Sequence, residues 1–353
     1  MVLSASANTF PRRLRLPAVA DKIPLRAGTI FETGESGFSF YAWIPWPFGG
    51  DPCSDRFGLR LVRWQLLAVV DARWEFCPAF DIVARDVGPS QGRGTVALIG
   101  RIMHEIAQPA LWRLGRKAWS SKIVRGALKF GSQPARRMSH VGKKCAFRKF
   151  FERFWIPAEL IPGHISRDGI HAQNVTALAR ACQAGHADPR EHFISLESIV
   201  PRVIGCVQFA NTEPVESSSG WGCWIPWERF GQQMKERPPG KLDPSQRSLF
   251  TREQRLWMVD HHRVGGMATG AGIRFPVYFQ YEPLREFAGR KIQVCFDSWA
   301  ERITATFVLP DAWRGYRRGH IIARDVPALE SSVETARTVL ACALRSARWL
   351  GKL

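Results

Sequence analysis

The sequence predicts a mixed α/β protein in which a core of strands and helices is followed by a small β-barrel and a C-terminal helix. Strand-like segments joined by short turns come first and indicate a three-strand antiparallel meander. Segments with the apolar spacing of helices follow, interrupted by one short strand. After residue 273 the periodicity changes to two, which is typical of half-buried strands in a small barrel. We expect these parts: a basic irregular tail at 1–24, the core at 25–213, a linker rich in Pro, Gly and Ser at 214–272, the barrel at 273–326 and an amphipathic basic helix at 327–353.

The core elements are expected in a definite order. Apolar and aromatic runs bounded by turn residues predict strands at 29–31, 38–45, 61–70 and 75–84. A helix at 95–107 is indicated by apolar residues three and four apart. A short strand at 111–114, helices at 120–129 and 146–155 around a loop at 131–144, and a last helix at 191–210 complete the core. In the barrel, strands are expected at 278–281, 291–296, 303–309 and 319–323.

The charge of the chain indicates a polyanionic partner. The net charge is +19, and the stretch from Arg113 to Arg153 holds thirteen Lys or Arg residues against one acid. Such a balance favours nucleic acid over an anionic membrane surface, and no run approaches the ~20 apolar residues that span a bilayer. The residues that we expect to contact DNA are Arg113, Arg116, Lys117, Lys122, Arg125, Arg136, Arg137, Lys143, Lys144, Arg148 and Lys149.

The cysteines indicate neither a disulfide framework nor a metal centre. Eight are scattered along the chain without a C-x-x-C pair. Zinc sites need closely spaced ligand pairs, and disulfide scaffolds need dense cysteine in a short chain. We therefore expect reduced thiols, no structural metal and a cytoplasmic location.

Six short segments, in order, carry a family resemblance: 42–47 (AWIPWP), 66–73 (LLAVVDAR), 113–121, 150–155 (FFERFW), 211–214 (NTEP) and 288–297 (AGRKIQVCFD). Together they resemble the integrase core and C-terminal barrel of bacteriophage Mu-type transposases, a retroviral-integrase-like (DDE) family. The resemblance implies a ribonuclease-H-like core, and the predicted order of strands and helices agrees with it. The helix-turn-helix modules that precede the core in that family have no counterpart here.

The resemblance also implies where the chemistry would lie. Members of the family cut and join DNA with three carboxylates that hold two divalent ions roughly 3.5–4 Å apart. In this sequence the three positions fall on Gly34, Gly115 and Arg148, and none carries an acid. Glu35 and Glu152 are the nearest possible substitutes.

We therefore expect a DNA-binding protein derived from a transposase, with neither strand-transfer activity nor a cofactor. The alternative is an active metal-dependent enzyme that uses displaced acids with Mg²⁺ or Mn²⁺. Besides DNA, the resemblance implies a second copy of the chain or a transposition ATPase as partner through the C-terminal helix. Alternatively, that helix packs onto the chain's own barrel.

Overall fold

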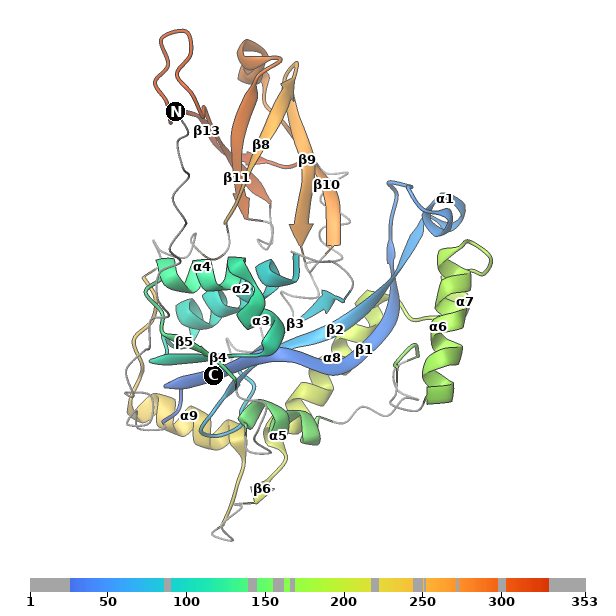
Figure 1. Cartoon of the computed structure of the whole chain (residues 1–353), viewed down its shortest axis with the longest axis vertical. Coiled ribbons are helices and arrows are strands. Elements are labelled where there is room, and N and C mark those ends of the chain that lie inside the picture. The colour runs from blue at the N-terminus through green and yellow to red at the C-terminus, as the bar shows by residue number, and fades with distance from the viewer. Residues whose placement is uncertain are drawn as a thin grey trace, which may run out of the picture.

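The computed structural model shows a mixed α/β core with a second, antiparallel sheet above it (Figure 1). It describes residues 26–85, 90–138, 145–154, 162–165, 169–216, 222–243, 250, 252–270, 273–297 and 303–329. The expected N-terminal tail lies outside these residues, and so does the expected C-terminal helix beyond residue 329. In the part of the chain that is described, no helix combines the length and the apolar character that a membrane span requires.

The core sheet has five strands in the order β3-β2-β1-β4-β5. Their bounds are β1 Ile30–Pro45, β2 Leu59–Asp71, β3 Ala79–Ala84, β4 Leu111–Leu114 and β5 Ala135–Arg137. Strand β2 is antiparallel to β1 and β3, whereas β4 is parallel to β1 and β5 is parallel to β4. Parallel strands end at the same edge of a sheet. The carboxyl ends of β4 and β5 therefore lie at the same edge of the sheet, where Leu114 of β4 pairs with Thr33 near the start of the long strand β1.

Helices cover both faces of this sheet because its strands alternate apolar side chains between them. Helices α2 (Ser90–Glu105) and α4 (Lys122–Phe130) pack on one face, over Phe31 and Trp112. Helices α5 (Ala146–Arg153) and α8 (Leu196–Thr212) pack on the other, over Trp64 and Leu66. Helix α9 (Pro226–Glu236) closes one end, where the rings of Phe76 and Phe230 are 4.6 Å apart.

Several expected elements differ from the structure. The two expected strands at 29–31 and 38–45 are one strand, β1, with an irregularity between Glu35 and Ser39. The expected loop at 131–144 contains β5, although its residues show no strand-like pattern. They pair with the open edge of β4, where the Trp112 N–H donates to Pro134 O and the Met138 N–H donates to Leu114 O. The expected helix at 191–210 is divided into α7 (Pro189–His192) and α8, and a short helix α3 (Arg116–Ser120) precedes α4. Helices α1 (Pro52–Phe57) and α6 (Gly169–Gln183) were not expected.

The linker expected at 214–272 is wrong, because most of its described residues form regular structure. It holds β6 (Val215–Glu216), β7 (Cys223–Trp224), α9, β8 (Arg252–Asp260) and β9 (Arg263–Gly270). Apolar residues on the exposed sides of β8 and β9, such as Leu256 and Met267, and the buried Glu253 hide the alternation, which becomes visible only from burial. The second sheet therefore begins at Arg252 and not at 273.

The second sheet has six antiparallel strands in the order β10-β9-β8-β11-β12-β13. The remaining bounds are β10 Ile273–Gln280, β11 Lys291–Asp297, β12 Thr304–Val308 and β13 Ile321–Pro327, with a 3-10 helix η4 at Glu282–Phe287. The sheet curls until Ala328, just after β13, bridges Phe279 of β10. Its inner face is filled by aromatic side chains such as Phe296 and Phe307, so it is barrel-like, as expected from the sequence. Phe250, before β8, packs against the core at Gly100 of α2.

Candidate nucleic-acid interface

The structure brings together two of the three positions at which the family resemblance implies an acid. Gly34 lies on β1 and Gly115 directly follows β4, where the parallel register pairs Thr33 with Leu114. The N–H of Gly115 donates to Thr33 O at 2.7 Å. A Cβ atom added to Gly115 would lie 3.2 Å from the Gly34 Cα. The two glycines are therefore neighbours at the carboxyl edge of β4.

This edge is filled by packing. A Cβ atom on Gly34 would lie 3.2 Å from Cζ of Phe147, whose ring comes from α5 and covers the glycine. At Gly115 the nearest atoms are backbone, which cannot rotate away. Neither glycine has a positive φ, so what requires glycine here is the lack of space. A carboxylate at either position would have to displace neighbouring atoms.

Helix α5 reaches the glycine pair through Phe147 and not through Arg148, the third position. The Arg148 Nε atom donates to Glu152 Oε1 at 2.9 Å, and these two side chains are 56% and 58% exposed. Both of them therefore point into solvent, one helical turn apart. Glu152 faces away from the glycine pair, and the side chain of Glu35 lies outside the described residues. The carboxylate of Glu152 is thus paired with Arg148 in solvent and not with other acids at the glycine pair.

The acid that does lie at this site is Glu32, which the sequence analysis did not single out. Its side chain is only 1% exposed. One carboxylate oxygen accepts from Arg113 Nη1 at 3.0 Å, and the other accepts from the Phe147 N–H at 2.9 Å. The register of β1 and β4 places Glu32 beside Arg113, so opposite charges on neighbouring strands were the signal that could have identified it. With a guanidinium already bound, this carboxylate is a poor metal ligand.

A second buried acid, Glu75, fixes the other end of α5. It accepts from Lys149 Nζ and Arg153 Nη1, both at 2.6 Å, and its carbonyl oxygen accepts from Arg153 Nη2 at 3.0 Å. Its backbone φ is 58°, a conformation that this network holds in place. Arg113, Arg148 and Lys149, three of the expected DNA contacts, are thus engaged in ion pairs within the protein.

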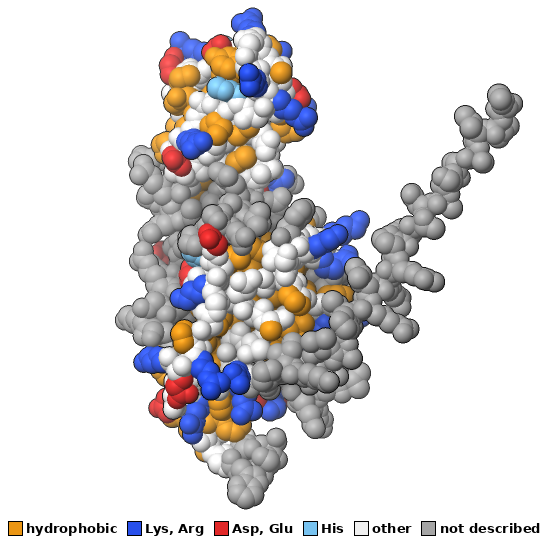
Figure 2. All heavy atoms as spheres, turned by 90° about the vertical axis from the view of Figure 1, so that its left-hand side faces the viewer, with side chains coloured by type: hydrophobic (Ala, Val, Ile, Leu, Met, Phe, Trp, Pro, Cys, Tyr) orange, Lys and Arg blue, Asp and Glu red, His pale blue; other side chains and the backbone are white. Residues whose placement is uncertain are grey.

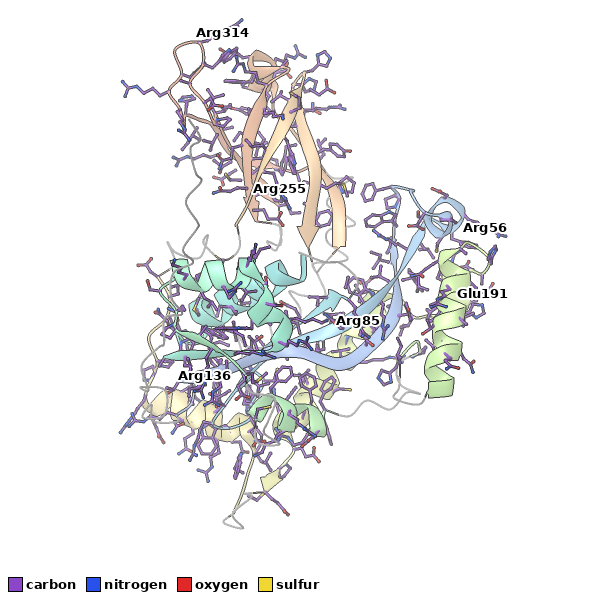
Figure 3. The ribbon with its side chains drawn as sticks, viewed as in Figure 1. Arg56, Arg85, Arg136, Glu191, Arg255 and Arg314 are labelled. Carbon is purple, nitrogen blue, oxygen red and sulfur yellow. The ribbon has the colours of Figure 1, made fainter. Side chains whose placement is uncertain are left out.

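The other expected DNA contacts surround the same edge. They come from α3, α4 and β5, and all are exposed except the partly buried Arg136: Arg116, Lys117, Lys122, Arg125, Arg136 and Arg137. Arg136 comes from the edge strand of the core sheet (Figure 3). Figure 2 shows Lys and Arg side chains on both the core and the barrel-like part of one face. Lys143 and Lys144 lie outside the described residues.

Asp71 has a structural role at the start of β1, close to Glu32. It pairs with Phe31 and is completely buried, and its two carboxylate oxygens accept N–H groups from Gly28, Arg73 and Trp74. Burial raises the pKa of Asp71 to about 7, although these N–H groups act in the other direction. The carboxyl group ties the first residues of the core to the β2–β3 turn.

The described residues contain no cluster of three or more His, Cys, Asp or Glu side chains that is suited to a metal ion. No protein-family model matches the chain, and no curated protein matches its sequence.

Proposed function

We propose that this protein binds duplex DNA along the exposed cations of α3, α4 and β5, and that it does not cut the DNA. The observation that carries the proposal is a group of solvent-exposed Arg and Lys side chains around one sheet edge, in a chain of net charge +19. Exposed cations can reach phosphates, and the release of counterions from DNA then favours binding. The ion pairs that Arg113 and Lys149 form with buried acids stabilise this part of the protein. The exposed residues of α3, α4 and β5 make the contacts with DNA.

The core is proposed to be ribonuclease-H-like and derived from a Mu-type transposase. Support comes from the sheet order, in which an antiparallel meander is followed by two strands parallel to its first strand. Further support comes from Gly34 and Gly115, which the resemblance assigned to one site and which are neighbours. A barrel-like sheet after the core is also what that resemblance implies.

The absence of cleavage follows from charge and from space. Two divalent ions need several oxygen ligands, whereas the glycine pair supplies none, a side chain at either glycine would have to displace its neighbours, and Glu32 is bound to Arg113. The exposed cations close by would also repel a second positive ion.

The test compares two matched charge reversals. Arg125 on α4 and Arg180 on α6 are both exposed helical arginines, so Arg125→Glu and Arg180→Glu change the net charge equally. Affinities for duplexes of unrelated sequence are measured by fluorescence anisotropy across a series of salt concentrations. We expect Arg125→Glu to weaken binding to all of the duplexes alike and to reduce the slope of log K against log salt by about 0.9, the value for one phosphate contact. Arg180→Glu should leave the slope unchanged.

Two outcomes would contradict the proposal. Equal losses of DNA affinity in the two variants would mean that only the total charge of the protein matters and that DNA does not bind to one particular surface. Nicking of a labelled supercoiled plasmid by the unmodified protein with Mg²⁺ or Mn²⁺, abolished by Glu152→Gln, would instead support the enzyme alternative.

A further inference from the structure

The outer face of the barrel-like sheet exposes large apolar side chains. They come from four strands, with exposed fractions between 38% and 59%: Leu256, Met258, Met267, Tyr278 and Ile321. A contiguous apolar patch of this kind on a soluble surface usually marks a contact site.

The strand register joins these side chains into one patch, here called the outer patch. Tyr278 pairs with Gly265, and its ring occupies the space where a Cβ of that glycine would stand. The pairing of Val259 with Val264, continued along the strands, places Met258 beside Gly265. On the far side, β11 and β12 extend the same face, where Gln293 pairs with both Leu256 and Val308 and Val308 pairs with Ile321. Because alternate residues share a face, all of these side chains lie on one side of the sheet.

The chain leaves the described structure at the edge of the outer patch. Ala328 bridges Phe279, and the Leu329 N–H donates to Tyr278 O at 2.8 Å. Residues 330–353 therefore start beside Tyr278, one of the exposed members of the patch.

The sequence of residues 330–353 matches such a surface. Apolar residues recur three and four apart, the spacing of one helix face, at Val333, Ala336, Leu340, Leu344 and Ala347. A helix over residues 333–350 would be about 27 Å long at 1.5 Å per residue. Along the curled sheet, the path from β10 to β12 is four strand spacings, about 19 Å, and the straight distance is shorter. The segment is long enough to cross the sheet.

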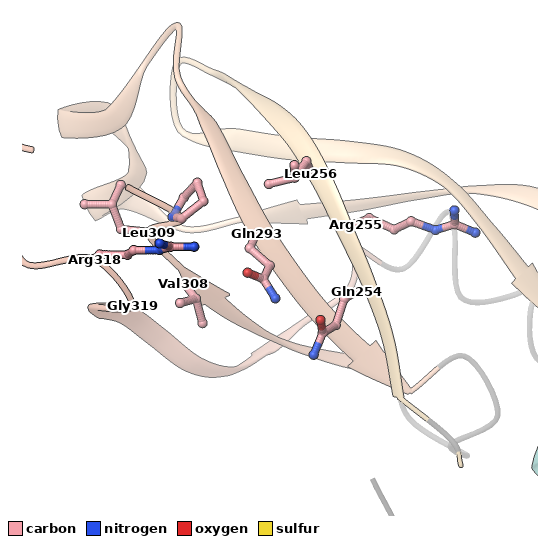
Figure 4. A pocket seen from close by; sticks show the side chains of 9 residues that line it. Gln254, Arg255, Leu256, Gln293, Val308, Leu309, Arg318 and Gly319 are labelled. Carbon is pink, nitrogen blue, oxygen red and sulfur yellow. The ribbon is translucent and has the colours of Figure 1, made fainter. Parts of the chain in front are cut away.

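A hollow lies at the far end of this path. It has a volume of about 400 Å³ and is lined by residues that include Leu256, Gln293, Val308 and Arg318 (Figure 4). Its mixture of apolar surface with amide and guanidinium groups suits a large side chain near the end of a helix. Trp349 is of this kind.

We propose that residues 330–353 bind within the same molecule as a helix across the outer patch, with the end of the helix at this hollow. The segment then covers apolar surface of the barrel-like sheet. The inference does not depend on DNA binding.

Limited proteolysis of the full chain tests the proposal, since a docked helix resists cleavage until it opens. Trypsin cleavage after Arg337 and Arg345 is followed by mass spectrometry. We expect Met258→Glu on the sheet to speed this cleavage at least about tenfold, and Leu340→Glu in the segment to have the same effect. The double variant should be cleaved no faster than either single variant, because each substitution already releases the segment.

The matched control is Phe209→Glu on α8, where a 57% exposed apolar side chain lies on another part of the molecule; its cleavage rate should equal that of the unmodified protein. Leu340→Glu lies outside the barrel-like sheet, so its effect does not depend on how Met258→Glu folds. Cleavage of the unmodified protein as fast as that of Met258→Glu would overturn the proposal. Protection that disappears on dilution would also overturn it, in favour of a second copy of the chain as the occupant.

Discussion

Asp71 should make the stability of this protein fall as the pH rises from about 4 to about 7. Burial raises its pKa from 3.8 to about 7 in the folded protein. The unfolded chain releases the proton near pH 4, whereas the folded protein keeps it until near pH 7. Folding is therefore coupled to proton uptake between these values, and the free energy of unfolding decreases across the window and is constant above it. A difference of about three pH units corresponds to about 4 kcal/mol, at 1.36 kcal/mol per unit.

The measurement is urea unfolding, followed by tryptophan fluorescence between pH 4.5 and 8, of the unmodified protein and of Asp71→Asn. The asparagine cannot ionise. Its amide NH₂ replaces one of the two carboxylate oxygens and cannot accept an N–H group, so the variant should be less stable by about 1–3 kcal/mol for each N–H left unpaired. This deficit should shrink as the pH rises, because only the unmodified protein loses stability through Asp71. Parallel stability profiles for the two proteins between pH 5 and 7 would refute the reasoning.

Two further predictions concern the glycine pair and the buried acid beside it. Gly34→Ala should lower the free energy of unfolding by about 1–3 kcal/mol, because its methyl group meets the Phe147 ring. Gly205→Ala, in open space on α8, should raise the free energy of unfolding by about 0.5–1 kcal/mol. If Gly34→Ala also raised the free energy of unfolding, the glycine pair would not be tightly packed. Arg113→Met should cost about 3 kcal/mol by leaving Glu32 buried without its cation, and adding Glu32→Leu should recover most of this loss. Urea unfolding measures both effects, and a double variant no more stable than Arg113→Met would show that the ion pair is not the cause.

Elements with a strong pattern were predicted well from the sequence. The strand expected at 111–114 is β4, and the helix expected at 146–155 is α5 with slightly different ends. Their patterns are local: a short apolar run, and aromatic residues at helical spacing. Strands β5 and β8 were missed because each pairs with a strand that is distant in the sequence. Strand β9 pairs with its sequence neighbours β8 and β10, and its glycines hide the alternation of its side chains. A partner strand supplies hydrogen bonds to a segment whose own residues show little preference.

For the candidate site, the sequence by itself determined the total charge, the density of cations between Arg113 and Arg153 and the lack of acids at Gly34 and Gly115. These are properties of composition and order, and folding does not change them. Only the tertiary structure decided which cations are available to a partner. It placed Glu32 against Arg113 and Glu75 against Lys149, and it left the arginines of α3 and α4 in solvent. The physical reason is that an ion pair needs its two groups within about 4 Å, and for residues far apart in the chain that distance is set by strand register and helix packing.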